Sequence, residues 1–152
     1  MEKKYRIDTQ ENRDFLSGIR DGLLSFGHRF PSPGGSSYYL GDDGTPWKEK
    51  NREAYVTCRM AHVYSIGSFL GHEGSGELVD AAVRGLAGEL RDTENGGWYE
   101  GLTAEGGILP GKQCYAHAFV ILAGTSAYLA GRDGAEKLLE EALKAYDKYY
   151  WN

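Results

Sequence analysis

The sequence has little of what several protein classes depend on. Two cysteines and four histidines in 152 residues make neither a disulfide framework nor a zinc-binding spacing. Acidic residues outnumber basic ones by 22 to 17, and the basic residues form no stripe along the chain. Nucleic acid is therefore not an expected partner, because nucleic-acid-binding domains concentrate lysine and arginine on one face.

Other absences narrow the class further. No apolar run approaches 18 residues, and no charged-then-apolar leader is present, so neither a transmembrane segment nor a secretion signal is expected. A phosphate-binding loop, a dinucleotide fingerprint and a nucleophile elbow are also missing. We therefore expect a cytoplasmic protein with no membrane partner, no metal and no cofactor, in which Cys58 and Cys114 are free, buried thiols.

Glycine and aromatic residues are abundant by contrast. The chain holds 22 glycines, 11 tyrosines, five phenylalanines and three tryptophans. Tyrosine and tryptophan each offer a stacking surface and a hydrogen-bonding tip. Sugars combine apolar CH faces with many hydroxyl groups, so this composition favours a sugar-binding face over a plain helical bundle.

The sequence repeats at an offset of 60 residues, since Tyr55–Asp92 aligns without a gap on Tyr115–Asn152. Five aligned pairs are identical: Tyr55 and Tyr115, Gly71 and Gly131, Gly74 and Gly134, Leu78 and Leu138, and Ala82 and Ala142. Each copy is expected to form a helix, a glycine-containing turn and a second helix. A helical hairpin cannot bury its apolar face alone, so hairpins of this kind stack on one another.

Hydrophobic spacing predicts five helices, a long loop over 31–50 and a small β-hairpin within 95–107. The helices are expected at 8–30, 52–70, 75–91, 112–130 and 133–150. The second and fourth are apolar over most of their circumference, which is typical of inner helices, whereas the third and fifth are amphipathic. This alternation predicts an all-α fold of the α/α toroid type, as an incomplete (α/α)6 barrel.

Several polar side chains are candidates for a site. Arg59 lies among apolar residues, so we expect it to be buried and paired, either in a structural ion pair or with its guanidinium directed into a cavity. His62 and His117 are either core residues or pocket residues. Gln113 and Tyr115 begin the fourth helix beside the glycine-rich segment, where a loop-lined pocket would open.

Four stretches resemble the N-acylglucosamine 2-epimerase family in the same order along the chain, and Tyr39-Leu40-Gly41 with Gly44 also fits. The four stretches are residues 57–65, 91–99, 112–119 and 148–151. The resemblance covers nearly the whole chain, and it is greatest to the aldose–ketose isomerases that act on mannose-like sugars and sulfoquinovose.

This resemblance implies an (α/α)6 barrel that interconverts sugars at C1 and C2 through histidine acid/base chemistry, without a metal or nucleotide. It also implies that Arg59, Tyr115 and Tyr55 contact a monosaccharide or sugar derivative. His62, Gln113, His117 and Tyr39 are expected to line the pocket. The catalytic histidines of the family have no counterpart here. We therefore expect residues 1–152 to form the N-terminal part of one barrel domain that is inactive alone.

Two alternatives remain open at this point. The chain could be a non-catalytic α/α module that associates with itself or with a complementary chain through exposed inner helices. It could instead be a toroid of the glycoside hydrolase type, which would need a pair of carboxylates. Glu94, Glu100 and Glu105 are the candidates for such a pair, but their loop setting favours solvent exposure.

Overall fold

The computed structural model describes residue 6 and residues 8–151. Within this part of the chain it has the five predicted α-helices, with bounds close to the expected ones. The helices are α1 (Gln10–Phe26), α2 (Ala54–Phe69), α3 (Ser75–Ala87), α4 (Cys114–Leu129) and α5 (Ala135–Tyr150). A short 3₁₀ helix, η2 (Gly27–Arg29), follows α1, so helical structure ends one residue before the expected last position, residue 30.

The β structure is more extensive than the single predicted hairpin. Strands β4 (Gly101–Leu102) and β5 (Ile108–Leu109) form that hairpin, displaced toward its C-terminal side, and β3 (Arg52–Glu53) adds a third antiparallel strand. The long loop holds a second hairpin of β1 (Tyr39–Leu40) and β2 (Pro46–Trp47). Strands of two residues give no periodic signal, so sequence patterns could not locate them.

The 60-residue repeat is confirmed in three dimensions. Helix α4 begins and ends 60 residues after α2. Gly74 and Gly134 precede the outer helices with the same left-handed backbone, φ 76° and ψ −7°. Gly71 and Gly131 also have positive φ, which only glycine adopts without strain. Asn152, the last position of the aligned segment, lies outside the described residues.

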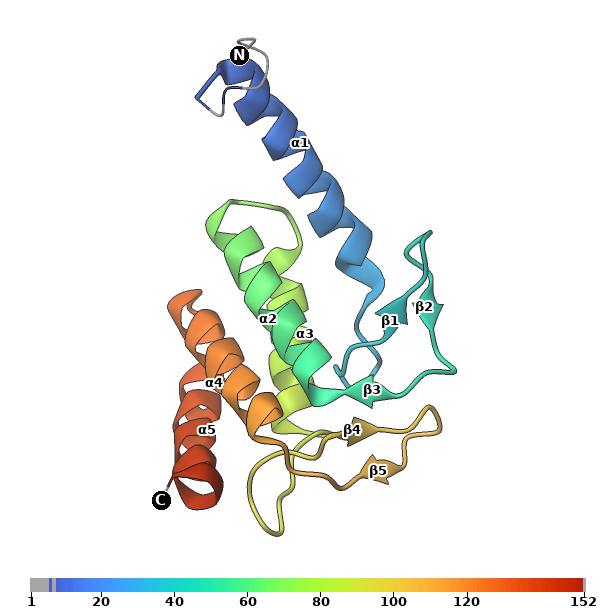
Figure 1. Ribbon diagram of the computed structural model, residues 1–152, viewed down its shortest axis with the longest axis vertical. Helices are drawn as coiled ribbons and strands as arrows, with labels where there is room; N and C mark the ends of the chain where they lie inside the picture. The colour runs from blue at the N-terminus through green and yellow to red at the C-terminus, as the bar shows by residue number, and fades with distance from the viewer. Residues whose placement is uncertain (1–5, 7, 152) are drawn as a thin grey trace.

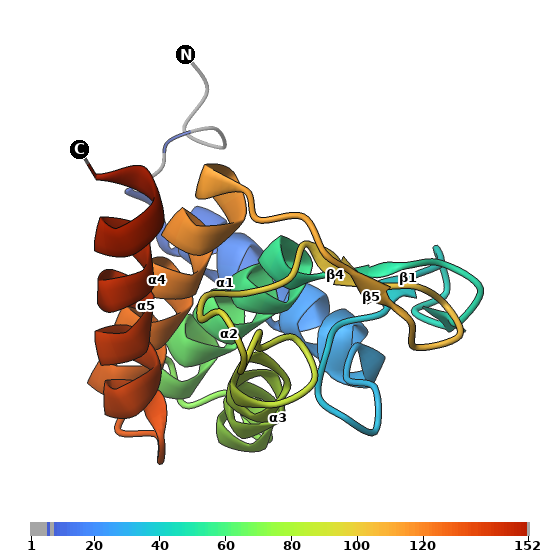
Figure 2. The same ribbon diagram turned by 90° about the horizontal axis from the view of Figure 1, so that it is seen from below.

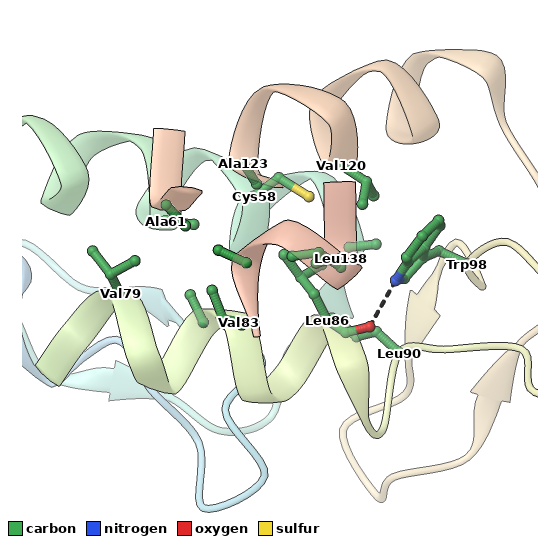
Figure 3. Close-up of a cluster of buried hydrophobic side chains, with 14 of the residues drawn as sticks. Cys58, Ala61, Val79, Val83, Leu86, Leu90, Trp98, Val120, Ala123 and Leu138 are labelled. Carbon is green, nitrogen blue, oxygen red and sulfur yellow. Dashed lines mark hydrogen bonds between the residues drawn. The ribbon is translucent and has the colours of Figure 1, made fainter. Parts of the chain in front are cut away.

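Helices α2 and α4 pack side by side, with α3 and α5 on their outer side (Figures 1 and 2). Small residues allow the close approach, since Ala61 and Cys58 of α2 and Ala123 of α4 are fully buried in one cluster (Figure 3). Trp98 closes one end of this core, and its indole N–H donates to the Leu86 carbonyl at 2.7 Å. Burial of such a core is the main stabilising contribution to the fold.

The remaining sides of the inner helices carry exposed apolar residues. Ile66 on α2 is 43% exposed and Leu129 on α4 is 65% exposed. Helix α1 contacts α2 near its C-terminal end, where the Tyr64 hydroxyl donates to the Leu24 carbonyl at 2.7 Å, and diverges from α2 toward its N-terminus (Figure 1). Of its apolar positions, Phe15, Ile19, Leu23 and Phe26 remain exposed. The inner helices therefore expose apolar surface in the described part of the chain, as predicted from the sequence for an incomplete barrel. Leu143 on the outer helix α5 is also exposed.

Among the described residues, no helix combines the length and the apolarity needed to cross a membrane. The two cysteines are free, and only Cys58 is buried. The prediction that Cys114 is buried is wrong: it is the exposed first residue of α4, and its Sγ lies 3.6 Å from the Tyr146 hydroxyl of α5.

Candidate functional site

The N-terminal ends of α2 and α4 meet the strands at one end of the molecule (Figure 1). Strand β3 continues directly into α2, and the Ala54 backbone N–H donates to the Glu100 carbonyl at 2.9 Å. Gln113 precedes α4 with an extended backbone, as Glu53 precedes α2. The first turn of α2 is thereby fixed against the segment that leads into β4.

One side of α2 and one side of α4 form a common surface beside these strands, which we name the open face. Contacts between the two helices, described below, join its polar residues. Toward the C-terminal ends of α2 and α4 the open face continues into the exposed apolar residues of these helices. The open face comprises Tyr55, Arg59, His62 and Ile66 of α2 and Tyr115, Phe119, Leu122 and Ser126 of α4.

Arg59 lies at the centre of the polar part of this face. Its Nη2 donates to the Tyr115 hydroxyl at 2.7 Å, and its guanidinium carbon lies 5.1 Å from the ring centres of both Tyr55 and Phe119. The predictions that Arg59 is buried and that it forms an ion pair are both wrong. The residue is exposed, and no carboxylate among the described residues pairs with it. Four guanidinium N–H groups therefore remain available to a ligand.

Two further tyrosines extend the group toward the strands. The Tyr55 and Tyr115 rings lie 5.7 Å apart in an edge-on arrangement, and the Tyr55 and Tyr39 hydroxyls are 3.1 Å apart. The hydrogen bond with Tyr55, burial and the nearby Glu53 carboxylate raise the pKa of Tyr39. Because Tyr39 stays protonated, these hydroxyls can donate and accept hydrogen bonds as sugar hydroxyls do.

His62 lies deeper along the open face and joins the inner helices. Its Nδ1 is 2.7 Å from the Ser126 hydroxyl, and that hydroxyl donates to the Leu122 carbonyl at 2.8 Å. Because the Ser126 hydroxyl already donates its proton to the Leu122 carbonyl, His62 Nδ1–H must be the donor in the hydrogen bond between His62 and Ser126. The half-buried ring thus fixes the register of α2 against α4.

His117 lies outside the Arg59 group. It is fully buried, and its Nε2 accepts from the Trp98 backbone N–H at 3.1 Å. Its Nδ1 is 2.9 Å from the Gln113 carbonyl, so the neutral ring carries its proton on Nδ1. Burial lowers the pKa of His117. Gly97 makes room for the ring, because a Cβ there would lie 2.6 Å from His117 Nε2.

The other candidates do not join this group. The side chain of Gln113 is exposed, and only its backbone carbonyl contacts His117. Glu94 and Glu105 are exposed and Glu100 is half-buried. No contact among the described residues brings any two of these carboxylates together, so this part of the chain does not support a hydrolase-type pair. Likewise, no cluster of three histidine, cysteine or acidic residues suitable for a metal occurs in the described part of the chain.

Two residues that lie beside the candidate site residues were not predicted from the sequence. Phe119 supplies a second ring beside Arg59, and the 60-residue repeat could have shown this, since position 119 is the equivalent of position 59. Glu53 lies beside Tyr39, and its Oε2 is buried without a hydrogen-bond partner among the described residues. No sequence pattern marks Glu53, because its position depends on the pairing of β3 with β4.

The fold and the site together define a class of protein. Stacked helical hairpins with alternating inner and outer helices form part of an α/α toroid. Its inner helices present an arginine and several tyrosine hydroxyls at the end where the connecting strands gather.

Comparison with known proteins identifies the family. Residues 34–152 match the sequence profile of N-acylglucosamine 2-epimerase (GlcNAc 2-epimerase), and the chain belongs to this family. It is 35% identical over 141 residues to a D-mannose isomerase from Thermobifida fusca. It is also 36% identical over 96 residues to a D-mannose isomerase from Pseudomonas cannabina pv. alisalensis.

These relatives are considerably longer than the chain. The alignments cover 92% and 63% of this chain but only 35% and 23% of the two isomerases. The chain therefore spans about a third of the length of the relative from Thermobifida fusca.

Solved structures show the same relationship. A sugar epimerase from a ruminal bacterium superposes with a TM-score of 0.73 at 26% identity, over 88% of this chain and 37% of that one. Cellobiose 2-epimerases from Bacillus thermoamylovorans B4167 and Spirochaeta thermophila DSM 6192 give 0.73 and 0.70 at 25% and 22% identity. The superposition covers 89% of this chain and 36% of the Bacillus enzyme, and 92% of this chain and 38% of the Spirochaeta enzyme. The fold is thus part of an (α/α)6 toroid.

Proposed function

We propose that this chain supplies part of the sugar-binding wall of an isomerase or epimerase that acts on mannose-like sugars. The single observation that carries the proposal is the Arg59 group. An exposed guanidinium held at 2.7 Å by the Tyr115 hydroxyl and flanked by aromatic rings offers directed donors and stacking surfaces together. Such a combination suits a sugar.

The proposed chemistry exchanges a carbonyl and a hydroxyl between C1 and C2. A base removes the proton from C2 of the open-chain aldose, and the electrons form an enediolate. Transfer of a proton from O2 to O1 and return of a proton to C1 give the ketose, whereas return of a proton to the opposite face of C2 gives the epimer. Arg59 would donate hydrogen bonds to the sugar oxygen on which negative charge develops, with Tyr115 and Tyr55 orienting the sugar.

The chain supplies no pair of proton-transfer groups beside Arg59 among the described residues. His117 is enclosed in the core, and His62 donates its Nδ1 proton to Ser126. We therefore propose that the catalytic histidines are provided by further helices of the barrel and that residues 1–152 alone do not turn over sugar. Measurable conversion of D-mannose to the ketose by the purified 152-residue chain would contradict this proposal.

Arg59→Ala tests the binding role directly. Calorimetric titration of the 152-residue chain with D-mannose is expected to show weak binding that the substitution reduces at least tenfold, since hydrogen bonds to a charged group are among the stronger ones. Arg29→Ala is the matched control, because Arg29 bonds the Gly44 carbonyl away from the open face. Equal affinity of the Arg59→Ala chain and the unmodified chain would contradict the proposal.

A second candidate function rests on the exposed apolar residues of the inner helices. Ile66, Leu122 and Leu129 are exposed on helices whose counterparts in a complete toroid are enclosed. We propose that this surface is covered by a complementary α/α segment or by self-association, since large exposed apolar patches mark interaction sites. As a non-catalytic module the chain would bind such a partner without needing Arg59, so the Arg59→Ala variant separates the two candidates.

A further inference from the structure

Glu53 places a buried carboxylate oxygen beside the open face, at the point where β3 joins α2 (Figure 1). The residue precedes α2 with an extended backbone, φ −78° and ψ 142°, and its side chain makes no capping hydrogen bond. Its Oε2 is buried without a hydrogen-bond partner among the described residues. Because a buried polar atom without a partner costs free energy, this oxygen calls for an explanation.

The neighbouring Arg52 does not pair with Glu53. Successive side chains of a strand point to opposite faces, and the Arg52 guanidinium carbon lies 5.4 Å from the ring centre of Tyr38. No ion pair within the described ranges, residue 6 and residues 8–151, involves either residue. The Glu53 carboxylate instead lies beside the Tyr39 hydroxyl and acts on it electrostatically. Because a carboxylate only accepts hydrogen bonds, the Tyr39 proton is the donor that it can use.

This carboxylate determines the direction of a second contact. The Tyr39 and Tyr55 hydroxyls are 3.1 Å apart, and either oxygen could be the donor in that pair. When the Tyr39 proton is directed toward Glu53, the Tyr39 oxygen can only accept, so Tyr55 must donate to it. The Tyr55 oxygen then offers a lone pair, and no proton, to a ligand on the open face.

The Arg59 side of the site has the opposite polarity. Arg59 Nη2 donates to the Tyr115 hydroxyl at 2.7 Å. The Tyr115 proton has no acceptor in the described part of the chain, so it can be donated to a ligand together with the remaining guanidinium protons. The Tyr55 ring lies 5.7 Å from the Tyr115 ring and 5.1 Å from the guanidinium carbon. A donating side and an accepting side therefore adjoin within one group.

We propose that Glu53 is a positioning residue that fixes the direction of the Tyr39–Tyr55 hydrogen bond and so selects a sugar with an accepting oxygen next to a donating hydroxyl. The oxygen on C1 accepts from Arg59 and Tyr115, and the hydroxyl on C2 donates to Tyr55. This inference rests on the proposed function and adds the specificity of the same site. Glu53 acts through the two tyrosines and does not itself contact the sugar.

The test compares D-mannose with 2-deoxy-2-fluoro-D-mannose, in which a fluorine that cannot donate replaces the C2 hydroxyl. Calorimetric titration of the 152-residue chain is expected to give about fivefold weaker binding of the fluoro sugar, which corresponds to the loss of one hydrogen bond. This ratio of the two affinities is the discrimination that Glu53 is expected to control.

Three variants locate the effect. Glu53→Gln keeps the size of the side chain but can donate as well as accept, so the discrimination should fall to within about twofold. Glu49→Gln is the matched control, because it removes an exposed carboxylate of the same segment, and it should leave the discrimination unchanged. Tyr39→Phe separates Glu53 from Tyr55 and should lower the discrimination as much as Glu53→Gln does. Circular dichroism of each variant establishes that the fold is retained.

A double variant distinguishes a chain of hydrogen bonds from independent effects. In the Tyr39→Phe background, Glu53→Gln should change the discrimination no further, because both substitutions interrupt the same chain. Additive effects of the two substitutions would show that Glu53 does not act through Tyr39 and would overturn the proposal.

The remaining outcomes separate this inference from the proposed function. If mannose binds in an Arg59-dependent manner but the fluoro sugar binds equally well, the Glu53 proposal is overturned and the proposed function stands. The same conclusion follows if Glu53→Gln weakens both sugars equally, since a purely structural role would leave their ratio intact. Failure of mannose to bind would contradict the proposed function and this inference together.

Discussion

At the residue scale, the open face depends on how aromatic rings constrain a single guanidinium. Tyr55 and Phe119 lie at equal distances from the Arg59 carbon, and Tyr115 accepts one of its N–H groups. An arginine side chain loses much conformational freedom when it binds a ligand. Here part of that loss has already occurred in the free protein, which favours sugar binding.

Titration of the buried His117 is expected to change the free energy of unfolding near neutral pH. Both ring nitrogens are engaged in the neutral form, and the ring is buried. Burial lowers its pKa, and the nearby Lys112 and Arg91 charges act in the same direction. The unfolded chain therefore binds a proton at His117 more readily than the folded chain does as the pH falls below the ordinary value of about 6.5.

The expected result is a melting temperature that decreases between pH 7.5 and pH 5, because protonation favours the unfolded state in this range. Thermal unfolding followed by circular dichroism measures it. His117→Gln, which cannot titrate, should show a smaller decrease than the unmodified chain over the same range. An identical pH dependence in the two proteins would contradict the assignment. Carboxylates such as Asp92, whose pKa the Lys112 ammonium lowers, act only at more acidic pH.

At the element scale, two glycines join the long loop to an outer helix. Gly35 of the loop has φ 104°, and Gly85 of α3 approaches it so closely that a Cβ on Gly85 would lie 2.5 Å from the Gly35 carbonyl carbon and 2.6 Å from Ser36 N. Glu89 one turn later accepts from Ser36 N at 2.9 Å. This contact holds the loop that leads to β1 against the hairpin α2–α3.

Gly85→Ala is expected to destabilise the protein by about 2 kcal/mol or more, because backbone atoms cannot move aside as a side chain can. Gly22→Ala on α1 is the matched control, since its Cβ would meet nothing within 4 Å. That change should stabilise the protein slightly, by roughly 0.5–1 kcal/mol, through helix propensity. Urea denaturation of both variants measures the difference. Equal stabilities would show that the loop does not pack on α3 as described.

At the scale of the whole molecule, the inner helices are enclosed on one side only. Their small residues pack together and against the outer helices, but the opposite side exposes Ile66 and Leu122 on the two sides of the His62–Ser126 hydrogen bond. Water-exposed apolar area of this kind favours association. The same face carries the Arg59 group, so a partner that covers the apolar residues would lie beside the proposed sugar-binding residues.

The chain is therefore expected to elute above its monomer mass of 16.8 kDa in size-exclusion chromatography with light scattering. Replacing Ile66 and Leu122 together by lysine should shift it toward the monomer, because two charges on the open face oppose burial. Leu143→Lys is the control, since Leu143 is comparably exposed on the outer helix α5. A monomeric unmodified chain, or an equal effect of the control, would contradict this prediction.

The sequence by itself determined the helices, their inner and outer types and the repeat, because these follow from local hydrophobic spacing and glycine turns. Through family motifs it also predicted the candidate site residues Arg59, Tyr115 and Tyr55. Only the tertiary structure decided that Arg59 is exposed between two rings, that His117 is enclosed, and that Phe119 lies beside Arg59 and Glu53 beside Tyr39. These placements depend on strand pairing and helix contacts between residues far apart in the chain, which local patterns do not encode.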